Sequence, residues 1–95
     1  MSNQQTQDTE LEAIRTAFFH AQKVKVDGKW YYALVYPTMI AFQTLNRRST
    51  NYYSGRDIFN RWKLVDDTLY YRQVINEGLR SHERTVWHKA ETKPL

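Results

Sequence analysis

Two segments of the chain, 39 positions apart, share one pattern of polar and apolar residues. They are residues 26–35 and residues 65–74, and each carries a β-branched residue, an acidic turn pair, a Tyr-Tyr dipeptide and a second valine. Turn-forming residues between runs of high strand propensity predict two β-hairpins. Asp27-Gly28 is the stronger turn because glycine accepts the positive φ of a type I′ hairpin, and Asp66-Asp67 is a poorer version.

The first hairpin is expected to consist of strands over residues 23–26 and 29–36. Both faces of its second strand are largely apolar. One face carries Trp30, Tyr32, Leu34 and Tyr36, and the other carries Tyr31, Ala33 and Val35. We therefore expect this strand to be covered on one side and partly on the other. Pro37 ends the ladder because it lacks an amide hydrogen.

Helical spacing of apolar residues predicts an N-terminal helix over about residues 10–22. Thr9 and Glu12 have the form of a capping box, in which each side chain satisfies the other residue's amide. Leu11, Ile14 and Phe18 follow at intervals that place them on one face. Residues 1–8 are polar, and we expect them to form a disordered leader.

Residues 38–46 fit two patterns. A short helix would bury Met39, Phe42 and Leu45, whereas a strand would turn Ile40, Phe42 and Thr44 inward. We favour the helix because a Thr-capped start precedes it. A polar loop over residues 47–54 is then expected to follow.

A second helix is predicted from Ser54 to about residue 63. Ser54 is its N-cap and Asp57 its third residue, while Ile58, Phe59 and Trp62 supply its buried side. The second hairpin follows, with a strand to about residue 74 and a short helix to about residue 83. Residues 69–79 also fit a single helix. Gly78 would then lie inside the helix and lower its stability by about 1 kcal/mol.

The predicted fold is a small α+β domain over residues 9–84, with an N-terminal helix, two β-hairpins and one or two short helices. Residues 85–95 are expected to be a mostly polar C-terminal tail. The order of elements favours a winged-helix-like arrangement, in which the second helix recognises DNA and the second hairpin is the wing. The residues that we expect in the core are Phe18, Leu34, Phe59 and Trp62.

Composition narrows the class of protein. The chain of 95 residues has no cysteine, which excludes disulfides and thiolate metal ligands. Neither a secretory leader nor an apolar segment long enough to cross a bilayer is visible, so we expect a cytoplasmic protein without membrane contact. The net charge is +4, and residues 47–95 hold the whole excess, with ten basic side chains against six acidic ones. A basic half favours an anionic partner, either nucleic acid or an acidic protein surface.

Candidate binding residues cluster in and around residues 47–61. In the winged-helix interpretation Arg56, Asn60 and Arg61 read base edges, since arginine suits guanine and asparagine suits adenine. Arg47 and Arg48 then contact phosphates.

The Tyr-Tyr pairs allow a second interpretation. Exposed tyrosines beside Arg47, Arg48 and Arg72 would form a platform on which single-stranded bases stack. Consecutive tyrosines on a strand face opposite sides, so one of each pair is expected in the core. Tyr52 and Tyr53 lie in the predicted loop, where packing does not require them.

Two function hypotheses follow. The first is a small basic regulator or accessory protein that binds nucleic acid through the loop and helix of residues 47–61. The alternative is a protein-binding inhibitor or adaptor, of the kind that phages and mobile elements encode, which uses the same surface. The three histidines show no metal-site spacing, and no nucleophile or acid/base constellation is present. We therefore expect no enzymatic activity, cofactor or metal.

Overall fold

The structure, a computed structural model, describes residues 3–77 and 82–94. Its elements follow one another in an order that alternates helices with runs of strands. They are α1 (Asn3–Ala21), β1 (Lys23–Val26), β2 (Lys29–Val35), β3 (Met39–Thr44), β4 (Thr50–Ser54), α2 (Gly55–Arg61), β5 (Trp62–Val65), β6 (Thr68–Glu77), β7 (His82–Lys89) and β8 (Glu91–Lys93).

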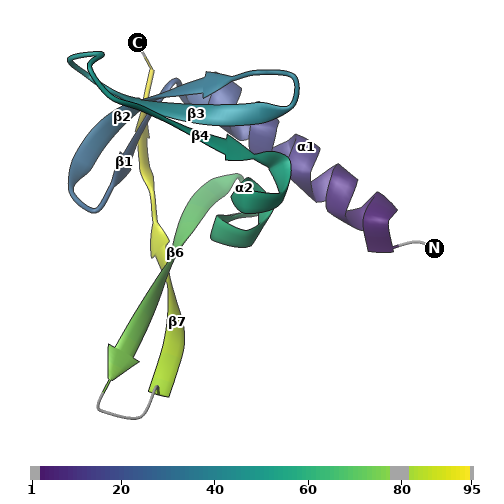
Figure 1. The fold of residues 1–95 in the computed structure, drawn as a ribbon. Coiled ribbons are helices and arrows are strands. Elements are labelled where there is room, and N and C mark those ends of the chain that lie inside the picture. The colour runs from purple at the N-terminus through teal and green to yellow at the C-terminus, as the bar shows by residue number, and fades with distance from the viewer. Residues whose placement is uncertain (1–2, 78–81, 95) are drawn as a thin grey trace.

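The strands form two antiparallel sheets (Figure 1). The larger sheet has the order β4-β3-β2-β1-β8, and the smaller has the order β5-β6-β7. The chain leaves the larger sheet through α2, forms the smaller sheet, and returns as β8 beside β1. At this return the Ala90 amide donates to the Leu69 carbonyl at 2.8 Å, so the crossing is held to β6.

Both predicted hairpins are present. β1 pairs with β2 around Asp27-Gly28, and β5 pairs with β6 around Asp66-Asp67. In the first turn φ is 52° at Asp27 and 79° at Gly28, and in the second it is 50° and 65° at the two aspartates. Positive φ at both central residues is the requirement of a type I′ turn. The second turn meets this requirement without glycine.

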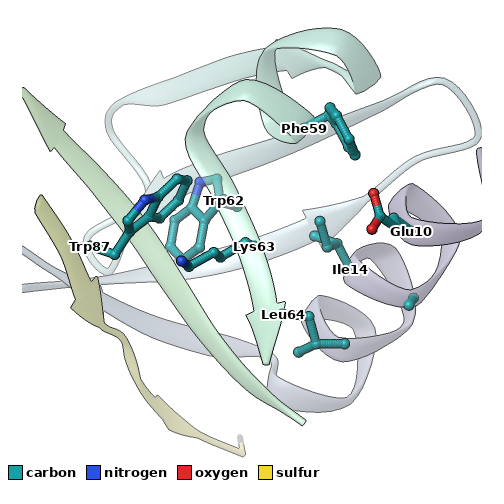
Figure 2. A pocket seen from close by; sticks show the side chains of 8 residues that line it. Glu10, Ile14, Phe59, Trp62, Lys63, Leu64 and Trp87 are labelled. Atoms are coloured by element: carbon teal, nitrogen blue, oxygen red, sulfur yellow. The ribbon is translucent and has the colours of Figure 1, made fainter. Parts of the chain in front are cut away.

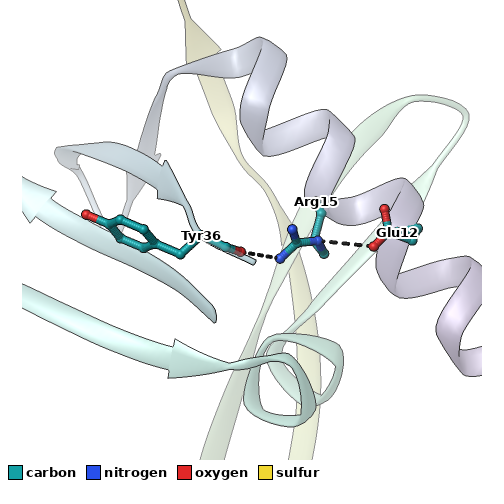
Figure 3. A network of polar contacts seen from close by, with 3 residues as sticks. All are labelled: Glu12, Arg15 and Tyr36. Carbon is teal, nitrogen blue, oxygen red and sulfur yellow. Dashed lines mark hydrogen bonds and ion pairs between the residues drawn. The ribbon is translucent and has the colours of Figure 1, made fainter. Parts of the chain in front are cut away.

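Helix α1 begins at Asn3, so Thr9 lies within the helix and is not its N-cap. Residues 3–8, where the sequence predicts a disordered leader, lie in α1, and residues 1–2 lie outside the described residues. Arg15 fastens this helix to the end of β2 (Figure 3). Its Nη1 donates to the Tyr36 carbonyl at 2.7 Å, and its Nε lies 3.3 Å from the Glu12 carboxylate.

Helix α2 begins where the sequence predicts. The Ser54 hydroxyl accepts from the Asp57 amide at 3.2 Å, which is the N-cap contact expected from this pair. Gly55 allows α1 to approach closely, because a Cβ there would lie only 2.8 Å from Leu11 Cδ2. The helix ends at Arg61, and Trp62 continues directly into β5.

The favoured helix over residues 38–46 is wrong, because residues 39–44 form β3. Ile40, Ala41 and Phe42 are buried in succession, so the strand lacks the alternation that marks a half-exposed strand. The helical spacing of Met39, Phe42 and Leu45 is incidental, since Leu45 is exposed.

Three further segments differ from expectation. Residues 50–54, expected in a loop, form β4. Residues 75–77 and 82–83, expected in a short helix, continue β6 and begin β7, and Gly78 lies outside the described residues. Most of the expected polar tail belongs to β7 and β8. These strands are formed by pairing with β6 and β1, which a polar sequence does not reveal.

The core lies between α1, α2 and the inward face of the larger sheet. The buried apolar residues that pack together in this core are Ile14, Phe18, Val24, Ala33, Ile40, Phe42, Ile58, Trp62, Leu69 and Ala90. Phe18 and Trp62 are buried as predicted, with ring centroids 4.8 Å apart. Phe59 is only half-buried, and the prediction for Leu34 is wrong because it lies half-buried on the opposite face of the sheet.

The fold is a small α+β domain, as predicted. The winged-helix arrangement is not found in the part of the chain that the structure describes. A strand replaces the middle helix of that arrangement, so α2 has no preceding helix in a helix-turn-helix relation to it.

Candidate nucleic-acid interface

The face of the larger sheet that points away from the core carries aromatic and basic side chains. Strand alternation and register place on it Lys23 and Lys25 of β1, Trp30, Tyr32 and Leu34 of β2, Met39, Ala41 and Gln43 of β3, Tyr52 of β4, and Glu91 and Lys93 of β8. We call this set the outer face. None of its members belongs to the core cluster or packs against it.

One row of register partners across the outer face ends at an exposed aromatic residue, Tyr52. Leu34, Ala41 and Tyr52 are register partners on three adjacent strands. Ala41 has no exposed surface although it points outward, because its small side chain lies between two large neighbours. Tyr52 is 62% exposed at the free edge of the sheet. Packing within the domain does not explain this aromatic side chain.

The next row concentrates positive charge around Tyr32. Lys93 of β8 lies directly opposite Lys23 of β1, and Lys23 lies directly opposite Tyr32 of β2. The Arg47 guanidinium, from the turn between β3 and β4, lies 5.0 Å from the centre of the Tyr32 ring. Like charges directly opposite each other destabilise a sheet.

No carboxylate among the described residues forms an ion pair with Lys23, Lys93 or Arg47. The neighbouring row shows the contrast, because Lys25 lies opposite Glu91 with 3.7 Å between the Lys25 Nζ and the carboxylate. The row of Lys93, Lys23 and Tyr32, together with Arg47 over the tyrosine ring, therefore holds three cations without a carboxylate partner.

The predicted site residues are divided between two surfaces and α2. Tyr52 and Arg47 belong to the outer face and its rim, and Arg48 is exposed in the same turn, where its amide donates to the Asn46 side chain at 2.9 Å. Arg56 and Asn60 are exposed on α2. The remaining predicted residues, Tyr53, Arg61 and Arg72, line a cleft between the sheets.

This inter-sheet cleft has a volume of about 290 Å³ and is lined by Val26, Asp27, Tyr31, Phe42, Asn51, Tyr53, Arg61, Trp62, Tyr71 and Arg72. Four of its rings form a continuous array. The centroids of Tyr53 and Phe42 are 5.6 Å apart, those of Phe42 and Trp62 5.7 Å, and those of Trp62 and Tyr71 5.7 Å. The Tyr71 hydroxyl accepts from the Asp27 amide at 3.1 Å, which ties the first hairpin to β6.

A second pocket, of about 270 Å³, lies between α1 and β5. Figure 2 shows Trp62, Lys63 and Trp87 on one side of it and Glu10 and Ile14 on the other. The Lys63 Nζ lies 4.4 Å from the centre of the Trp87 ring. This pocket is mainly apolar, and its single lysine is offset by Glu10, so it offers little to an anionic partner.

Sequence reasoning missed Lys23, Trp30 and Lys93 on the outer face and Asn51 in the cleft, and it considered Tyr31, Tyr32 and Tyr71 only as members of the Tyr-Tyr pairs. A signal for Trp30 and Tyr32 was present, since alternation places them on one strand face. Lys23 and Lys93 are 70 positions apart and meet only through the pairing of β1 with β8. No local pattern could indicate that contact.

The described residues contain no group of three or more His, Asp or Glu side chains placed to hold a metal ion. Within the same residues, neither helix combines the length and apolar character that spanning a membrane requires. Comparisons with protein-family models, with curated proteins and with solved structures found no match to this chain.

Proposed function

We propose that this protein binds single-stranded nucleic acid on the outer face of its larger sheet. The observation that carries the proposal is the row formed by Lys93, Lys23 and Tyr32, with Arg47 over the tyrosine ring. Three cations without carboxylate partners match a phosphate backbone, and the aromatic ring between them matches an unpaired base.

In this proposal the bases stack on the aromatic side chains of two strands. Trp30 and Tyr32 are two residues apart on β2, which separates them by about 6.6 Å along the strand and allows each to take a different base. Tyr52 extends the platform to the edge strand β4. Each stacked base contributes about 1–3 kcal/mol.

The geometry favours a single strand over a duplex. Only unpaired bases expose their faces to an aromatic ring, and open sheets with surface aromatics are a common platform for such bases. The duplex interpretation of the sequence needed α2 as a recognition helix. That helix has seven residues, and Arg61 at its end lines the inter-sheet cleft, so Arg56 and Asn60 alone would remain to read a groove.

The test is fluorescence anisotropy with labelled oligo(dT) and oligo(rU), compared between the protein and its Tyr32→Ala and Tyr52→Ala variants. Each variant is expected to weaken binding by about 1–3 kcal/mol, because one stacking surface is lost. Phe19→Ala is the matched control, since Phe19 is an exposed aromatic residue on α1, outside the outer face. It should leave the affinity unchanged.

The Arg47→Ala, Arg48→Ala double variant should weaken binding and flatten its dependence on salt while the fold is retained, because both side chains are exposed in a turn. Equal affinities for the protein, both tyrosine variants and the arginine variant would contradict the proposal. The alternative, a protein-binding inhibitor or adaptor, predicts no oligonucleotide affinity, together with a partner complex that depends more on Tyr52 or Tyr53 than on either arginine.

A further inference from the structure

The inter-sheet cleft lies apart from the outer face. Its lining residues come from the inward face of the larger sheet, from the end of α2 and from β5 and β6. None of the outer-face residues lines it. Its volume of about 290 Å³ lies just below the range of small-ligand sites, about 300–1,000 Å³.

The walls of the cleft are aromatic. Tyr31, Tyr53 and Tyr71 are each half-buried against the core, so their rings are held in place while part of each remains accessible. Tyr53 and Tyr71 stand at the two ends of the four-ring array. A planar aromatic ligand is the kind of molecule that such walls bind best.

Two arginines reach the cleft from different elements. The Arg61 guanidinium, at the end of α2, lies 5.4 Å from the centre of the Tyr53 ring, and Arg72 enters from β6. No acidic side chain among the described residues forms an ion pair with either of them. Guanidinium groups without carboxylate partners suit a phosphate, which they bind through two parallel hydrogen bonds.

Two shorter polar side chains complete the lining. Asn51 offers an amide of the type that pairs with the edge of adenine. Asp27 offers a carboxylate of the type that accepts hydrogen bonds from ribose hydroxyls. The aromatic walls suit a base, the arginines suit a phosphate, and these two polar groups suit the edge of the base and the ribose. The lining therefore matches the three parts of a nucleotide.

We infer that the inter-sheet cleft binds a nucleoside phosphate, with the base between the tyrosines and the phosphate on Arg61 and Arg72. The ligand is either a free nucleotide or the phosphorylated end of a strand, since both present the same chemistry. The inference does not rest on the proposed function of the outer face, because the two surfaces share no residue.

Isothermal titration with AMP, adenosine and inorganic phosphate tests the site. AMP should bind more tightly than either of the others, and Arg61→Gln and Arg72→Gln should each weaken AMP binding about tenfold or more. Arg56→Gln is the matched control, because Arg56 is an exposed arginine on the same helix that does not line the cleft. It should leave the AMP affinity unchanged.

A second titration separates the two sources of the ligand. If the ligand is a strand end, a 5′-phosphorylated oligonucleotide should bind more tightly than the same oligonucleotide with a 5′-hydroxyl, and Arg61→Gln should remove the difference. If it is a free nucleotide, AMP binds and the two oligonucleotides do not differ. Tyr52→Ala, on the outer face, should weaken the binding of both oligonucleotides equally, and it should change neither the AMP affinity nor the difference between the two oligonucleotides, so the two proposals fail separately. Absence of AMP binding together with equal affinities for both oligonucleotides would overturn the inference.

Discussion

The two hairpins carry one sequence pattern but turn opposite sides of it toward the core. Trp30 and Leu69 occupy the same position of the 39-residue repeat, yet Leu69 is buried and Trp30 lies on the outer face. The Tyr-Tyr pairs divide in the same way. In the first hairpin Tyr31 packs against the core, and in the second the inward residue is Tyr71, which corresponds to Tyr32.

This difference shows that the turn determines the register of a hairpin, whereas the packing partners determine which face of it turns toward the core. The turn fixes the register of each hairpin, because both have two residues with positive φ between paired strands. The inward face is decided by the residue across the ladder. Val24 is buried opposite Tyr31, whereas Trp62 is buried opposite Tyr71.

The largest expected effect on stability comes from comparing Leu69→Ala with Trp30→Ala, two substitutions at the same position of the repeat. Leu69→Ala should lower the free energy of unfolding by about 2–5 kcal/mol, because it leaves a cavity in the core. Trp30→Ala removes a larger side chain but should cost about 1 kcal/mol, because that residue is half-buried outside the core cluster. Urea denaturation followed by circular dichroism measures both. Equal losses would mean that the two faces have been assigned wrongly.

Much of the secondary structure could be predicted from local signals. Asp27-Gly28 and Asp66-Asp67 indicated the hairpins, and Ser54 with Asp57 indicated the start of α2. The strands that were missed lack such signals. The central residues of β3 are buried in succession without alternation, and β8 has three polar residues that pair with β1 only after the chain has passed through the smaller sheet.

The next effect concerns the turns themselves. Gly28→Val should destabilise the domain by about 1–2 kcal/mol, because a β-branched residue resists a positive φ. The strain would arise from the backbone alone, since no atom lies within 4 Å of a Cβ built at Gly28, where φ is 79°. A thermal melt measures the loss. A Gly28→Val variant with an unchanged melting temperature would contradict the type I′ assignment.

A smaller effect of the opposite sign is expected in the second turn. Asp67 holds a φ of 65° with a side chain present, so Asp67→Gly should relieve strain and raise stability by about 0.5–1 kcal/mol. The reverse change, Gly28→Asp, is its matched control and should lower stability. If Asp67→Gly also lowers the stability of the domain, the aspartate side chain stabilises the turn by more than the strain of its positive φ costs.

The candidate site was predictable only in part. The sequence indicated that a Tyr-Tyr pair on a strand would divide, and Tyr31 and Tyr71 do pack against the core. It placed Tyr52 and Tyr53 in a loop without a packing role, whereas Tyr53 also packs against the core and only Tyr52 is exposed. It placed Arg47 and Arg61 on one surface, but the strand β4 between them puts Arg47 beside the outer face and Arg61 in the inter-sheet cleft. That separation depends on β4, which had been expected to be a loop.

The central claim is that unpaired cations around Tyr32 bind a phosphate backbone. The most direct test is the salt dependence of oligo(dT) affinity, measured for the protein and for a Lys23→Gln, Lys93→Gln double variant. If both lysines contact phosphates, the slope of log K against log salt concentration should become less steep by about 1.4. An unchanged slope, or no oligonucleotide binding by the unaltered protein, would contradict the account.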